Sequence, residues 1–218
     1  MEGASTEELC KRFRQLYVPA IADVLDTAGL WHQVMTDVMP LSVDMTVAGP
    51  AFTAYGRPER STDRTKRLGA AMIDELAPGN VVVFDCANDR TVGHWGELLT
   101  NGALARGAAG AVIDGGVRDT QAILKLDFPV FHKFRAARDA KGRWNVVDMN
   151  IPITCGGVPV RPGDIIVGDS DGVVVVPVEM AWDVLVEAER TVAVESEIRA
   201  RVLAGESMGT LYQQYDRF

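Results

Sequence analysis

One stretch of the chain, residues 96–119, limits the possible folds more than any other. A helical pattern opens at Gly96, and a short buried strand over 111–114 follows it almost at once. The strand is followed by two glycines and then by the charged pair Arg118–Asp119. A strand that follows a helix this closely runs back along it, so its carboxyl end returns to the start of the helix. We therefore expect Gly96 and the charged pair to lie close together.

Helical patterns occupy the two ends of the chain, and strand patterns lie mainly between them. Ser5 followed by Glu8 forms a capping box that opens the first helix. Helices are predicted over 5–16, 19–28, 68–76, 96–108 and 178–204. Strands are predicted within 41–55, at 81–85, 111–114 and 128–131, and among turns as far as about 177.

Helices do not alternate regularly with strands, which favours a layered mixed sheet over a doubly wound fold. We predict one α/β domain over 1–218 with a long C-terminal helix. Its parts would be N-terminal helices (1–40), a core (41–177), and the C-terminal helix with a polar-aromatic tail that could dock on a neighbour (178–218).

Charge and cysteine content exclude several classes of function. The net charge is −8, and the basic segment 57–67 is interrupted by acids and has no aromatic residues for base stacking. Nucleic-acid binding is therefore not expected. Three cysteines without a C-x-x-C motif favour a reducing compartment. No apolar run approaches the roughly 18 residues that span a bilayer, so we expect a cytoplasmic protein without a membrane association.

Familiar catalytic motifs are missing from the sequence. There is no G-x-S-x-G elbow, no H-E-x-x-H pair, no P-loop, and no G-x-G-x-x-G after a strand. Nucleophilic triads and nucleotide binding therefore have no support. Chemistry based on carboxylates and an arginine remains.

The helix start and the charged pair together suit a 2-oxo acid. Asp119, with water and Glu97, suits Mg²⁺ or Mn²⁺, which usually takes only one or two protein carboxylates. Arg118 offers a planar fork for a substrate carboxylate, and the backbone amides from Gly96 through Leu98 to Leu99 could bind an anion. A metal that chelates the keto and carboxylate oxygens would stabilise an enolate. The alternative is a surface ion pair of little consequence.

Neighbouring residues could extend such a site. Glycines 115–116 would let the backbone turn sharply and approach a ligand. His94 could contact substrate or act as a base, or be an ordinary loop histidine. Trp95 is expected to be a pocket wall or an interface residue. Arg57 and Asp89 are in predicted loops and could bind the distal end of a substrate.

The segment HWGELLTNGALARGAAGAVIDGGVRD resembles the signature region of the RraA-like family. Its members include class II pyruvate aldolases acting on 4-hydroxy-4-methyl-2-oxoglutarate or 4-carboxy-4-hydroxy-2-oxoadipate. Family aldolases carry an acidic residue, twenty intervening residues, and then Arg-Asp. Glu97, residues 98–117 and Arg118–Asp119 match that spacing. The resemblance covers roughly 20–205.

The resemblance implies a ββα swivelling sandwich and a trimer, often paired into hexamers, with sites between subunits. Asp119 would bind Mg²⁺ or Mn²⁺ directly, Arg118 would hold the pyruvyl carboxylate and the enolate, and Glu97 would hold metal-bound waters. An acid from the neighbouring subunit's C-terminal helix would complete the shell through water. Glu195 is the best match and Glu197 the second choice; Glu195 lies on an otherwise apolar helical stripe, where a carboxylate needs a partner.

The implied activity is cleavage of a 4-hydroxy-2-oxo acid to pyruvate and a second carbonyl compound, with oxaloacetate decarboxylation as a side reaction. The alternative is a non-catalytic regulator of ribonuclease activity, because the family's founder is an inhibitor of ribonuclease E. The regulator's pattern keeps the arginine but lacks the aspartate that follows it, and this chain has Asp119. The distal half of the substrate stays open between aromatic-degradation dicarboxylates and sugar-derived oxo acids.

Overall fold

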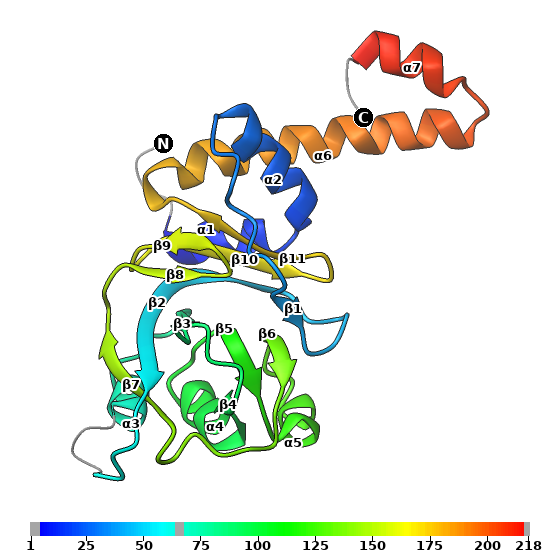
Figure 1. Ribbon diagram of the computed structural model, residues 1–218. Coiled ribbons are helices and arrows are strands. Elements are labelled where there is room, and N and C mark those ends of the chain that lie inside the picture. Colours follow the sequence, from blue (N-terminus) through cyan, green and yellow to red (C-terminus); the bar gives the residue numbers. More distant parts are fainter. Residues whose placement is uncertain (1–4, 64–67, 216–218) are drawn as a thin grey trace.

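The computed structural model describes residues 5–63 and 68–215, and a mixed sheet forms its centre (Figure 1). The strands in the described residues follow the order β1-β6-β5-β3-β2-β10-β11, with β4 beside β5 and β7 beside β2. They are β1 (Met39–Pro40), β2 (Val47–Pro58), β3 (Val81–Asp85), β4 (Gly93–Trp95), β5 (Gly110–Val117), β6 (Val130–Arg135), β7 (Trp144–Met149), β10 (Ile165–Asp169) and β11 (Gly172–Val176). A separate hairpin joins β8 (Ile153–Cys155) to β9 (Val158–Val160).

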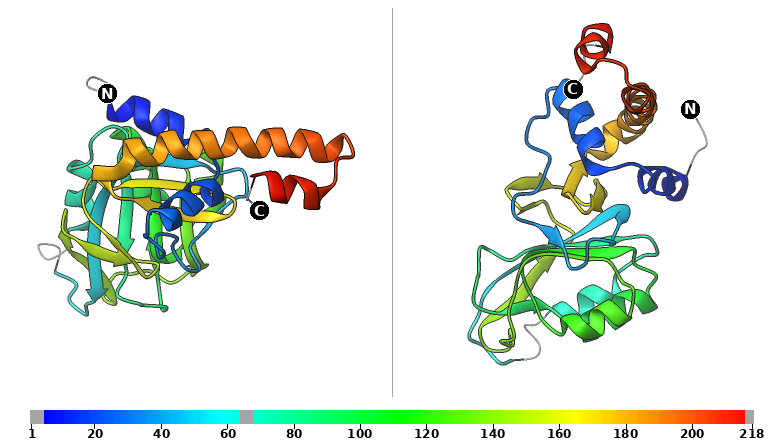
Figure 2. Two further views of the ribbon diagram at one scale, coloured as in Figure 1. Left: turned by 90° about the horizontal axis from the view of Figure 1, so that it is seen from above. Right: turned by 90° about the vertical axis from the view of Figure 1, so that its right-hand side faces the viewer.

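Helices cover the sheet from two sides (Figures 1 and 2). They are α1 (Thr6–Phe13), α2 (Val18–Thr27), α3 (Gly69–Asp74), α4 (Glu97–Ala105), α5 (Thr120–Lys125), α6 (Ala181–Leu203) and α7 (Met208–Tyr215). One side carries α3, α4 and α5, and the other carries α1, α2 and α6. The predicted layered α/β fold with a long C-terminal helix is confirmed. Among the described residues, no helix has the length and apolar character needed to cross a membrane.

Strand β2 connects the two halves of the sheet. Its first part pairs with β10, and its later part pairs with β3 on one edge and with β7 on the other. Apolar side chains on both faces are buried, as in a strand that has a packed layer on each side. Three apolar clusters form the core: one under α3 and α4, one between the strand layers, and one under α1, α2 and α6.

The ends of the first two helices follow from their capping residues. The Glu8 backbone amide donates to Ser5 Oγ at 3.2 Å, as the capping box predicts. The helix ends at Phe13, earlier than the predicted residue 16. Pro19 lies in the first turn of α2, and Gly29 ends that helix with φ +84°, a conformation that glycine adopts without penalty.

The C-terminal part differs from the prediction in one respect. The tail after Gly205 forms helix α7, which folds back beside the end of α6 (Figure 2). Arg201 Nη1 donates to Tyr215 Oη at 2.9 Å, and this hydroxyl donates to Glu197 at 2.5 Å. The short helix α5 was also not predicted. Of the predicted basic segment 57–67, residues 64–67 lie outside the described residues, as do 1–4 and 216–218 of the predicted domain.

Candidate active site

The end of β5 lies beside the start of α4, as the helix-to-strand connection predicted. The short strand β4, which was not predicted, makes the link because it pairs in parallel with β5 just before α4 begins. The Arg118 backbone amide donates to the Trp95 carbonyl at 2.9 Å. The Glu97 backbone amide donates to Asp119 Oδ2 at 3.3 Å. The structure therefore brings Glu97, Arg118 and Asp119 together.

Asp119 has a backbone conformation that turns its side chain toward α4. Its φ of 56° and ψ of 30° are left-handed, which costs a non-glycine residue roughly 1–2 kcal/mol. Although it precedes α5, its carboxylate does not cap that helix. It faces the start of α4 instead, where first-turn amides have no intrahelical partner and the helix dipole favours negative charge.

The Arg118 guanidinium lies between two carboxylates. Its Nε is 3.7 Å from Asp119 Oδ2, and its Nη2 is 3.5 Å from Asp139 Oδ1. Both distances exceed the roughly 2.7–2.9 Å of a charge-assisted hydrogen bond, and a third of the side chain is exposed. The guanidinium is thus oriented while its donors stay available to a ligand. Asp139 was missed by the sequence reasoning, because it lies in the segment after β6, where it forms an isolated bridge with Gly93, and belongs to no motif.

Gly96 is required by the close approach of the charged pair. A Cβ atom on Gly96 would lie 2.7 Å from Asp119 Oδ2 and 3.2 Å from Arg118 Cγ. Its own backbone is extended and unstrained, with φ −162°. The reason for glycine at this position is therefore space for these two side chains.

The double glycine has a different role from the predicted one. Strand β5 continues to Val117, and Gly115 and Gly116 lie buried inside it. A Cβ on Gly115 would lie 2.5 Å from His94 Nδ1, and one on Gly116 would lie 2.3 Å from the Val92 carbonyl oxygen. The predicted sharp turn toward a ligand is wrong. The glycines let β4 and its histidine pack against β5.

His94 is placed inside the protein. Its side chain is fully buried, and Nδ1 accepts a hydrogen bond from the Gly116 amide at 2.9 Å. Burial lowers the pKa of the ring, and nearby Asp89 opposes that shift in part. A ring in this position has no free edge for a ligand. The expected substrate contact of His94 is therefore not what the structure shows.

The residues around the start of α4 face different environments. Trp95 is 1% exposed, packs edge-on against Phe84 at 5.6 Å, and donates from Nε1 to Thr100 Oγ1 at 2.8 Å. It is a core residue, so the expectation of a pocket wall or interface is wrong. Leu98 is 82% exposed, whereas Leu99 is partly buried against the core. Leu98 is thus positioned to contact a ligand or another chain.

Glu195 lies elsewhere in the same chain. It accepts a hydrogen bond from the Tyr17 hydroxyl and lines a groove of about 1010 Å³ between α2, α6 and α7. This groove lies on the side of the sheet opposite α4 (Figure 1). Within one chain Glu195 does not join Asp119, and its contribution from a neighbouring subunit stays a prediction.

Arg57 and Asp89 were both expected in loops near the distal end of a substrate, and for Arg57 this is wrong, because it lies in strand β2 and pairs with Asn145 of β7. Arg57 is exposed near the end of β2. The Asp89 side chain is 5% exposed and accepts hydrogen bonds from the backbone and the hydroxyl of Thr91. Asp89 therefore acts inside the protein, whereas Arg57 stays accessible.

The site offers one partly exposed carboxylate, at Asp119, and this suits only a metal ion that keeps most of its water. Within the described ranges, no group of three or more His, Cys, Asp or Glu residues could hold a metal ion. Asp119 offers a single carboxylate that is 44% exposed, and Glu97 lies beside it. Mg²⁺ and Mn²⁺ fit this donor set, because Mg²⁺ usually takes one or two carboxylates and keeps several waters.

The layered mixed sheet, the long C-terminal helix and the cluster of Glu97, Arg118 and Asp119 describe one class of layered α/β protein. The RraA-like family model, described as Aldolase/RraA, matches residues 18–175. The chain belongs to this family.

Three relatives illustrate that class. A Halalkalibacterium halodurans protein named "Putative 4-hydroxy-4-methyl-2-oxoglutarate aldolase" is 37% identical over 90% of this chain and 89% of its own length. An uncharacterized Pseudomonas syringae protein superimposes with a TM-score of 0.89 at 26% identity, covering 99% and 97% of the two chains. Streptomyces coelicolor RraAS2, described as an unusual member of the RNase ES inhibitor RraA family, gives 0.82 at 28% identity over 89% and 98%.

Proposed function

We propose that this protein is a divalent-metal-dependent aldolase that cleaves a 4-hydroxy-2-oxo acid to pyruvate and a second carbonyl compound. The observation that carries the proposal is the Asp119 carboxylate, held against the start of α4 beside a partly exposed Arg118. A relative at 37% identity with an aldolase name supports the same reaction class.

Each residue of the cluster has a role in binding. Asp119 would hold Mg²⁺ or Mn²⁺ directly, and Glu97 would hold water around it. When bound, the metal supplies Lewis-acid stabilisation of negative charge. The Arg118 fork binds the substrate carboxylate in two hydrogen bonds. The amides of Leu98 and Leu99 at the helix start stabilise the negative oxygen that develops during cleavage, while the Glu97 amide holds Asp119.

The bond changes follow from this placement. The C3–C4 bond breaks, and its electron pair becomes the enolate of pyruvate. The 4-hydroxyl proton passes to a water held by the Glu97 carboxylate, and the second product leaves with a new carbonyl group. Protonation of the enolate at C3 completes pyruvate. Decarboxylation of oxaloacetate passes through the same enolate and is expected as a side reaction.

The proposed assembly is a trimer or a dimer of trimers. In it, Glu195 of one subunit would complete the water shell at the Asp119 site of the next. Contacts between chains are consistent with two exposed apolar regions. One is Leu98 beside this site, and the other is the far end of α6 with α7, where Leu203 and Tyr212 are exposed.

A coupled assay tests the proposal. Oxaloacetate and Mg²⁺ are supplied with lactate dehydrogenase and NADH, and pyruvate formation is followed. We expect turnover that stops when the metal is chelated and resumes when it is restored. Absence of turnover with metal present and the assembly intact would contradict the enolate chemistry. A panel of 4-hydroxy-2-oxo acids then identifies the distal half of the substrate.

The second candidate is a non-catalytic regulator that binds another protein. Its support is the similarity to Streptomyces coelicolor RraAS2. Calorimetric titration with Mn²⁺ in the presence of pyruvate or oxalate separates the two candidates. An aldolase binds oxalate more tightly with metal than without, whereas a regulator is expected to bind neither Mn²⁺ nor oxalate at this site.

A further inference from the structure

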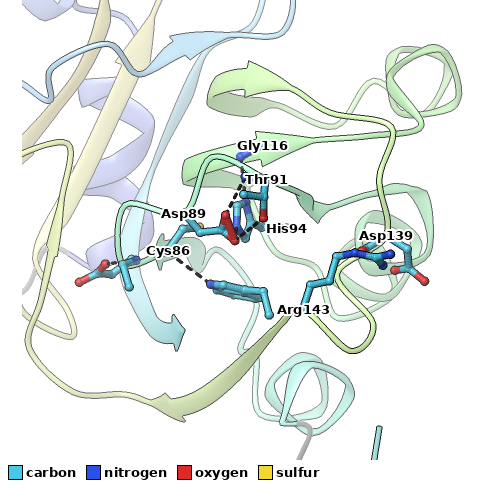
Figure 3. A network of polar contacts seen from close by, with 10 residues as sticks. Cys86, Asp89, Thr91, His94, Gly116, Asp139 and Arg143 are labelled. Atoms are coloured by element: carbon cyan, nitrogen blue, oxygen red, sulfur yellow. Dashed lines mark hydrogen bonds and ion pairs between the residues drawn. The ribbon is translucent and has the colours of Figure 1, made fainter. Parts of the chain in front are cut away.

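We propose that His94 is a positioning residue that sets the end of β5, and with it the Arg118–Asp119 pair, through its hydrogen bond to the Gly116 amide. The inference deepens the proposed function and rests on it. His94 reaches Gly116, which is two residues before Arg118, from the neighbouring strand (Figure 3).

The hydrogen bond lies where the strand pairing is irregular. The β5–β6 register shifts between Ile113 and Gly116, and the β4–β5 register shifts between Gly93 and Trp95. A bulge leaves part of the backbone ladder unpaired. Here the imidazole supplies the acceptor for the Gly116 amide at 2.9 Å, so a side chain replaces a regular ladder contact just before the charged pair.

The second ring nitrogen faces Asp89. His94 Nε2 lies 3.7 Å from Asp89 Oδ2, a distance longer than a hydrogen bond. The carboxylate is held in turn by the Thr91 amide at 2.7 Å and the Thr91 hydroxyl at 3.1 Å. Because Nδ1 accepts from Gly116, a neutral ring carries its proton on Nε2, toward Asp89. Asp89 thus favours the tautomer that leaves Nδ1 free to accept.

The loop that delivers Asp89 has an unusual backbone. Ala87 and Asn88 both have positive φ, 51° and 57°, which non-glycine residues rarely adopt. The Asp85 carboxylate accepts from the Ala87 amide at 2.8 Å and helps hold this turn. The loop therefore folds back so that a carboxylate lies 95% buried beside the ring.

Packing leaves the ring little freedom to move. It lies edge-on to Trp144 at 4.7 Å and to Phe134 at 6.4 Å. There is no room for a Cβ between Nδ1 and Gly115. Ring position and the Gly116 amide are therefore coupled, and a change of acceptor at His94 shifts the backbone that leads to Arg118.

Three variants separate positioning from packing. His94→Asn keeps an oxygen acceptor near the place of Nδ1. His94→Leu fills similar space without an acceptor. Phe134→Leu is the packing control, because it removes an aromatic contact with the same ring and leaves the hydrogen bond in place.

The measurements are made on the assembled protein. They are oxaloacetate turnover with Mg²⁺, Mn²⁺ affinity by calorimetry, and the amide resonances of Gly116 and Glu97 by NMR. We expect His94→Leu to lose about 10- to 100-fold in turnover and Mn²⁺ affinity, the usual range for a residue that orients a ligand. Its Gly116 amide should exchange faster, and its Glu97 amide should shift as Asp119 moves.

The positioning role is supported if His94→Asn recovers most of the turnover and Mn²⁺ affinity. Its thermal stability should then be no higher than that of Phe134→Leu, so that restored stability does not explain the recovery. Equal behaviour of His94→Leu and Phe134→Leu in turnover, metal affinity and the Glu97 amide overturns it. A wild-type protein without oxaloacetate turnover refutes the proposed function. The Gly116 and Glu97 amides then still decide the inference, since they report the backbone and not the reaction.

Discussion

The Glu97 backbone amide donates a hydrogen bond to the Asp119 carboxylate, and this contact joins the start of α4 to the residue that follows β5. Twenty-one residues lie between the two, residues 98–118. The contact presents one carboxylate to the positive end of a helix. The carboxylate stays partly exposed in this position, which suits a ligand to a hydrated cation.

Asp119→Asn should abolish turnover of oxaloacetate. Amide substitution keeps the size of the side chain and removes the charge that would bind the metal. We expect a loss beyond the roughly 10- to 100-fold typical of residues that only orient a ligand. Asp139→Asn is the matched control, because Asp139 also faces Arg118 but is half exposed. Its loss should stay within about fivefold. Similar losses in both variants would assign Asp119 to orienting Arg118 alone.

Arg118→Lys should lower kcat/KM for oxaloacetate about 10- to 100-fold. The ammonium group keeps the charge but cannot form two parallel hydrogen bonds to a carboxylate, and one hydrogen bond to a charged group contributes roughly that factor. Steady-state kinetics over a range of substrate concentrations measures the change. Unchanged kcat/KM would show that Arg118 is not the carboxylate clamp.

Gly96→Ala should impair activity more than stability. Its Cβ would lie 2.7 Å from Asp119 Oδ2, so the carboxylate has to leave its position. A displacement near 1 Å costs about 100-fold in rate. Gly69→Ala, where a Cβ meets nothing within 4 Å, should leave the rate unchanged. Thermal melting and oxaloacetate turnover are compared for both, and wild-type activity of Gly96→Ala would contradict the tight approach.

The Arg12–Glu189 pair should stabilise the fold in a pH-dependent way. The Arg12 guanidinium donates two hydrogen bonds to Glu189 and lowers the pKa of that carboxyl. A lowered folded-state pKa stabilises the protein above the ordinary glutamate pKa of about 4.3, and the effect is lost as the pH falls through the lower folded value. A double-mutant cycle with Arg12→Met and Glu189→Gln should give a small coupling at pH 7 and none in acid. Coupling that persists in acid would contradict the ion pair.

The cysteine thiols should resist modification in the native state. Burial raises the pKa of Cys10 to about 11 and raises the pKa of Cys86 and Cys155 well above the usual range. Reaction needs an accessible thiolate. An Ellman titration at pH 8 should therefore show no rapid reaction until denaturant is added. Fast reaction of one thiol in the folded protein would show that its pocket opens.

The sequence predicted the contact between Glu97 and the Arg118–Asp119 pair because it depends on one helix and one strand adjacent in the chain. The environments of Trp95 and His94 were not predictable in the same way. Strand β4 has only three residues, which is too short to show a periodic pattern in the sequence, and its strand conformation depends on its pairing with β5. The orientation of both side chains follows from that pairing.

The long-range partners of Arg118 and His94 could not be predicted from the sequence either. Asp139 reaches Arg118 from the segment after β6, where it forms an isolated bridge with Gly93, and Asp89 reaches His94 through a loop with two left-handed residues. The glycines 115–116 were expected to form a turn, because a double glycine usually ends a strand. They continue β5 instead. Glycine is needed at both positions because a neighbouring ring and a carbonyl oxygen occupy the space that side chains would need.

The course of strand β2 has a consequence for how the chain reaches its native state. Pro50 pairs with Ile165, and Tyr55 pairs with Asp85 and Asp148. The first pairing closes a long loop, whose entropic cost precedes any gain from contacts. Topologies of this kind fold slowly. During synthesis, the edge of β2 that pairs with β10 stays unpaired until β10 has left the ribosome, and an unpaired strand edge favours aggregation during that interval.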